Sequence, residues 1–125
     1  MLKKFAGLAL ISLAAATAVA PVWAHGPAQA KHGGVVQKAN DLSFEMVSSP
    51  TGVVIHIDDH GKPLVPTGMT GQLTILSGTQ RTQVPLTVSG NTLQAAGVQL
   101  ASGSRVVATI TTAQRQVMTV RFVAP

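Results

Sequence analysis

The chain contains no cysteine and no tyrosine, and only 4 of its 125 residues are acidic. Without cysteine it can form neither a disulfide framework nor a thiolate metal site. Any metal ligand must therefore be a histidine, a methionine, a carboxylate or the terminal amine. The single tryptophan lies at position 23 and the basic residues are scattered. Since no aromatic stacking surface lies beside a basic groove, we expect no nucleic-acid partner.

The start of the chain has the three parts of a secretory signal peptide. A positive segment (MLKK) precedes an apolar run over residues 5–20, and Val22 and Ala24 occupy the −3 and −1 positions of a cleavage site. The run is rich in alanine and shorter than the roughly 20 apolar residues that span a membrane. We therefore predict an exported, periplasmic protein that begins at His25 and has no stable membrane anchor after cleavage.

The remaining chain alternates apolar and polar residues with a period of two, which is typical of strands. Turn residues separate segments at 35–39, 42–48, 52–58, 71–78, 81–89, 91–97, 105–112 and 115–124. We predict an all-β fold, an antiparallel β-sandwich or small barrel (Ig-like) of about seven or eight strands. The predicted domain plan is a signal peptide (1–24), a flexible His/Gly arm (25–34) and a β-sandwich domain (35–125).

The alternation also predicts a core. The residues expected to face inward are Leu42, Phe44, Ile55, Ile57, Leu73, Ile75, Val106, Ala108, Ile110, Met118, Val120 and Phe122. Pro85 lies within a strand pattern, and proline has no amide hydrogen to donate. We therefore expect that strand to be an edge strand, or to be bulged, at Pro85.

Signatures of catalysis are missing from the sequence. Asp58 and Asp59 are adjacent, so on a strand they point to opposite faces and do not form a carboxylate pair. The chain after residue 24 has no GxSxG elbow and no glycine-rich phosphate loop. We expect a binding protein and not an enzyme.

The histidines offer a different chemistry, because all four lie between residues 25 and 60. The stretch HIDDH contains His56, Asp58, Asp59 and His60, and alternation places His56 and Asp58 on one face of a strand. Imidazoles that are neutral near pH 7, combined with a carboxylate, suit Cu(II), Zn(II) or Ni(II). The same residues also fit plain surface chemistry, because Asp and Gly favour turns for backbone reasons.

Cleavage after Ala24 would add a further donor set. The α-amine and the Nδ1 atom of His25 can chelate one ion, and a nitrogen of His32, His56 or His60 would complete a T-shaped copper site, a histidine brace. A brace-type copper redox enzyme is therefore a third hypothesis. The alternative is a disordered tail that begins with histidine.

Four motifs between residues 32 and 122 resemble a small periplasmic β-domain of heavy-metal efflux systems. They are HGGVV, DLSFEMV, DDHGKPL and TGQLTIL. In that family the domain forms the N-terminal part of some membrane-fusion (adaptor) subunits of tripartite metal exporters, and it also occurs as short free-standing exported proteins. The resemblance implies His32, in HGG, and His60, in the DHGKP turn, as metal ligands, and it does not imply His56.

These observations predict a periplasmic transition-metal-binding protein, with copper favoured over zinc or nickel. It would serve metal resistance, buffering or delivery to an efflux complex. The expected donors are His32 and His60, then His25 and His56, with Asp58 or Asp59 as a carboxylate ligand or supporting group. The alternative is a non-metal interaction module of the cell envelope that uses its sheet faces or edge strands.

Overall fold

The computed structural model describes residues 15–18 and 29–125. These residues form strands, turns and irregular segments without any helix, and hence without a helix that could cross a membrane. Apart from residues 15–18, which have no regular structure, the predicted signal peptide lies outside the described residues. The same is true of His25.

The described residues fold into an antiparallel β-structure of nine strands. The strands are β1 (Val35–Ala39), β2 (Leu42–Ser49), β3 (Gly52–Asp59), β4 (Lys62–Pro63), β5 (Thr70–Ser77), β6 (Gln80–Ser89), β7 (Thr92–Ala96), β8 (Arg105–Thr111) and β9 (Val117–Val123). Their order in space is β1-β2-β3-β7-β6-β5-β8-β9, with β4 paired to the end of β3. Since β5, β6 and β7 follow one another and β8 returns beside β5, these four strands form a Greek key. The predicted all-β antiparallel fold is confirmed.

The two end strands almost close the sheet into a barrel. β1 and β9 lie side by side, but no backbone ladder joins them. β6 connects the two layers, because residues 80–86 pair with β5 and residues 87–89 pair with β7. Pro85 lies just before this change, where β6 is paired on one side only, so the predicted edge position is confirmed.

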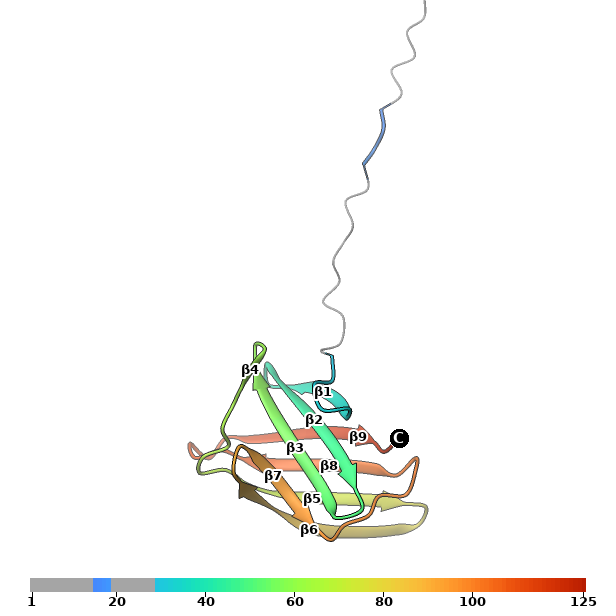
Figure 1. The fold of residues 1–125 in the computed structure, drawn as a ribbon, viewed down its shortest axis with the longest axis vertical. Helices are drawn as coiled ribbons and strands as arrows, with labels where there is room; N and C mark the ends of the chain where they lie inside the picture. The colour runs from blue at the N-terminus through green and yellow to red at the C-terminus, as the bar shows by residue number, and fades with distance from the viewer. Residues whose placement is uncertain (1–14, 19–28) are drawn as a thin grey trace, which may run out of the picture.

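The core fills the space between the two layers. Figure 1 shows β2, β3 and β7 crossing in front of β5, β8 and β9. Every residue of the predicted inward set is buried except Leu42, which is half-buried and packs at the margin beside the β1–β2 turn. Leu42 therefore faces the core as predicted but is only partly covered. The core also contains Val53, Leu86, Leu93 and Ala95.

Two tight hairpin turns lie at the same end of the β2–β3 pair. Asn40 and Asp41 connect β1 to β2, and His60 and Gly61 connect β3 to β4, all four with positive φ angles of 52°, 61°, 50° and 85°. This backbone conformation is that of a type I′ turn, which matches the twist of the flanking strands. The predicted turn over residues 59–63 is therefore only two residues long, and the prediction missed β4.

Candidate functional site

A buried carboxylate on the outer face of β2 holds the segment that precedes β1. Glu45 points away from the core, yet it is only 5% exposed. Its Oε1 atom accepts a hydrogen bond from the amide of Lys31 at 2.9 Å, and its Oε2 atom accepts bonds from the amides of His32 and Gly34, each at 2.8 Å. Because the acceptor is charged, these are among the stronger hydrogen bonds in proteins.

These bonds keep the carboxylate ionised. Burial raises the pKa of Glu45, but the amides of Gly34, Lys31 and His32, with the nearby His32 imidazole, lower it more, so the pKa lies below its ordinary value of 4.5. Residues 31–34, which we expected to belong to a flexible arm, are therefore attached to the sheet at neutral pH.

Both glycines of the HGG motif have a backbone role in this attachment. Gly33 adopts a φ of +73°, which glycine reaches without steric cost. At Gly34 a Cβ atom would lie 2.3 Å from the carbonyl oxygen of Met46, so only glycine allows this close approach. The docking of residues 31–34 onto β2 thus explains both glycines without reference to a metal.

The docked segment brings His32 against His56. His56 lies on β3 directly opposite Glu45, and its ring stacks on that of His32 with centroids 3.6 Å apart and an angle of 15° between the ring planes. Nδ1 of His32 lies 3.4 Å from Oε1 of Glu45. Burial lowers the pKa of His56 below 6.5, and the positive charge of a protonated His32 adds to this effect, against the opposing influence of Glu45 and Asp58. His56 is therefore a neutral imidazole at pH 7.

Asp58 completes this group of polar side chains on the outer face. Its Oδ2 atom lies 3.1 Å from Nζ of Lys31, which also donates a hydrogen bond to the carbonyl oxygen of Gly61 at 2.9 Å. Lys31, His32, His56 and Asp58 all line one cavity of about 250 Å³. We call this the imidazole cavity.

His60 and Asp59 lie apart from the imidazole cavity, at the β3–β4 turn. The side chain of His60 is 82% exposed, and its Nδ1 atom is hydrogen-bonded to Oδ1 of Asp59. His60 lines a different cavity, together with Asn40 and Asp41 of the neighbouring turn. The structure therefore brings together His32, His56 and Asp58 among the predicted ligands and leaves His60 and Asp59 as a separate exposed pair.

The stacked rings are not yet arranged as metal ligands. Over residues 15–18 and 29–125, no three His, Cys, Asp or Glu side chains form a group that could hold an ion as they stand. An ion bound to two imidazoles lies near both ring planes, at roughly 2.0–2.1 Å from each nitrogen. Rings stacked 3.6 Å apart have no such common point, so one ring must turn before both can bind. His32 is the freer ring, because it is 42% exposed and lies outside the strands.

Two residues of this site were not predicted from the sequence. Glu45 is the only glutamate in the chain and occupies an outward position of a strand. That combination, following a His-Gly-Gly segment, is the signal that could have identified it. Nothing in the sequence pattern indicates that Lys31 contacts Asp58, because the contact depends on how residues 31–34 dock.

Comparisons of the chain with protein-family models, with curated proteins and with solved structures found no match. The resemblance to the adaptor domains of metal exporters therefore rests on the four motifs.

Proposed function

We propose that the protein binds a transition-metal ion, copper in preference to zinc or nickel, at the imidazole cavity. The observation that carries this proposal is the contact between His32 and His56, which joins two imidazoles from distant parts of the sequence beside Asp58. Imidazole nitrogen and carboxylate oxygen together suit borderline divalent cations. The lowered pKa of His56 supports the proposal, since only the neutral ring coordinates an ion.

The docked segment allows His32 to move without being released. Turning the His32 ring breaks its stacking on His56 and its 3.4 Å contact with Glu45, while the three amide hydrogen bonds of residues 31–34 stay in place. Asp58 can join the two imidazoles once Lys31 turns toward solvent, and 45% of the Lys31 side chain is already exposed. Binding is reversible and involves no turnover.

The biological role follows from the predicted export and from the resemblance. We infer a periplasmic protein that buffers copper, contributes to metal resistance or delivers the ion to an efflux complex. His60 with Asp59 forms an exposed secondary pair, and His25 adds donors if cleavage follows Ala24. The interaction-module alternative would use another surface of the molecule.

The proposal is tested by calorimetric titration of the purified protein with Cu(II) and Zn(II). His32→Gln and His56→Gln should each weaken binding by about 100-fold, since even the loss of a group that only supports a ligand costs roughly 10–100-fold. His60→Gln is the matched control and should change the affinity less than threefold. If all three variants bound the ion as tightly as the unmodified protein, or if only His60→Gln lost affinity, the assignment would be contradicted.

A further inference from the structure

Charge is distributed unevenly between the two halves of the molecule. No acidic residue follows Asp59 in the sequence, whereas all four arginines do. They are Arg81, Arg105, Arg115 and Arg121. The layer formed by β5, β8 and β9 therefore carries guanidinium groups without any acidic side chain. None of these arginines takes part in an ion pair among the described residues.

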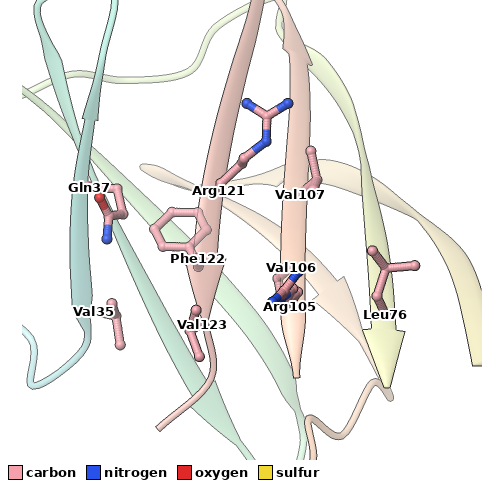
Figure 2. Close-up of a pocket in the computed structure, with 9 residues that line it drawn as sticks. All are labelled: Val35, Gln37, Leu76, Arg105, Val106, Val107, Arg121, Phe122 and Val123. Atoms are coloured by element: carbon pink, nitrogen blue, oxygen red, sulfur yellow. The ribbon is translucent and has the colours of Figure 1, made fainter. Parts of the chain in front are cut away.

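Two of the arginines border a groove on the outer face of this layer. Arg105 lies opposite Leu76 of β5 and Val123 of β9, and Arg121 lies opposite Val107 of β8. These side chains line a cavity of about 430 Å³, whose far side is formed by β1. Figure 2 shows Val35 and Gln37 of β1 on that side. We call it the arginine groove.

The groove combines positive charge with exposed apolar surface. Leu76 is 38% exposed and Val123 is 57% exposed, although most large apolar side chains of this domain are buried. A matching ligand offers carboxylates to the two guanidinium groups and an apolar side chain to the valines and the leucine. β1 and β9 meet beside the groove without pairing, so an extended chain also finds strand edges there.

Two other occupants fit this surface less well. A second copy of the chain has little negative charge to offer, because only Asp41 and Asp59 of its four acidic side chains are exposed and they lie at two separate tight turns, while Glu45 is buried and Asp58 is paired with Lys31. A bilayer presents a broad surface that contacts protruding side chains, whereas this site is hollow.

We propose that the arginine groove docks an extended acidic segment of a partner protein. Carboxylates of that segment pair with Arg105 and Arg121, and an apolar side chain packs against Leu76, Val107 and Val123. This interaction goes beyond metal binding and uses a different face of the molecule. Peptide docking and metal binding can therefore be tested, and refuted, independently.

The test measures binding of a labelled synthetic peptide that alternates glutamate and valine. Its counterpart with glutamine in place of glutamate and vesicles containing phosphatidylglycerol are the comparison ligands. The protein variants are Arg105→Gln/Arg121→Gln and the control Arg115→Gln, whose site is the β8–β9 turn outside the groove. Thermal unfolding followed by circular dichroism establishes that each variant is folded.

We expect the acidic peptide to bind, and the double variant to raise its Kd about tenfold, a change of about 1.4 kcal/mol. Arg115→Gln should change the Kd less than twofold, and salt should weaken binding because it screens exposed charges. Copper affinity should be the same in all variants. Absence of peptide binding, equal binding of the glutamine peptide, no effect of the double variant, or binding of vesicles alone would each overturn the proposal.

Discussion

Replacing Glu45 with glutamine should detach residues 31–34 from β2 while the barrel stays folded. The glutamine oxygen can take the place of Oε2 and accept the amides of His32 and Gly34, but its NH₂ group then faces the amide of Lys31. One charge-assisted bond is lost, and two become neutral. Hydrogen bonds to charged groups contribute about 1.5–3 kcal/mol and neutral ones about 0.5–1.5 kcal/mol. The docking equilibrium should therefore weaken by at least about 3 kcal/mol, or at least roughly 100-fold.

Amide hydrogen exchange followed by NMR measures this effect directly. The amides of Lys31, His32 and Gly34 should exchange roughly 100-fold faster in Glu45→Gln, whereas those of the core strands should change little. Asp41→Asn is the matched control, because it removes one negative charge at an exposed turn where a positive φ suits asparagine. Unchanged protection of the three amides in Glu45→Gln would refute the role assigned to the carboxylate.

The same contact predicts a pH dependence with a defined sign. Because the pKa of Glu45 is lower in the folded protein than its ordinary value of 4.5, docking is fully stabilised above that value. The stabilisation is lost as the pH falls through the lower, folded-state pKa. This acid-induced release should be absent in Glu45→Gln, where no titrating group remains at that position.

Further predictions concern other parts of the molecule. An NMR titration should give His56 a midpoint below 6.5, and His32→Gln should move it back toward 6.5 by removing the second positive charge; an unchanged midpoint would contradict this explanation. Since a depressed histidine pKa means that the unfolded chain binds the proton more tightly, this contribution to stability should fall as the pH drops below 6.5. Phe44→Ala should lower the free energy of unfolding by about 3–5 kcal/mol in urea denaturation, and a loss below 1 kcal/mol would be inconsistent with a fully buried ring. His60→Asn should stabilise the type I′ turn by about 0.5 kcal/mol, seen as a higher urea midpoint, because asparagine before glycine is preferred there; a lower midpoint would argue against the turn assignment. Intact mass of the exported protein should place His25 first, and any other first residue would remove the histidine brace from consideration.

Much of this fold could be predicted because one face of each strand is buried. In β8 and β9, where apolar residues recur at every second position, the predicted inward residues are all in the core. The run GVVIHID contains three consecutive apolar residues, Val53, Val54 and Ile55, and the inward position of Val53 was missed. Leu42 satisfies the alternation but begins its strand directly after a tight turn, at the margin of the core, and is only half-buried. β4 was missed because two residues are too few to show a period.

The candidate site was only partly predictable. The sequence places His56 and Asp58 on one strand face, and the structure keeps them together around the imidazole cavity. The sequence gives no indication that His32 stacks on His56, because that contact depends on the hydrogen bonds between the amides of residues 31–34 and Glu45 on the outer face of β2. His60 was predicted as a ligand because of the DHGKP motif, and the structure shows that this motif forms a type I′ turn.

The most direct test of metal binding at the imidazole cavity is an NMR titration with Zn(II), observing the ring resonances of all histidines in ¹³C,¹⁵N-histidine-labelled protein. Zn(II) is diamagnetic, so it reports the ligands that copper would also use without broadening their signals. The proposal predicts that the ring signals of His32 and His56 shift together and saturate at a stoichiometric amount of zinc, with His60 responding only to excess. Shifts that begin at His60, or ring signals of His32 and His56 that stay unchanged with zinc in excess, would contradict it.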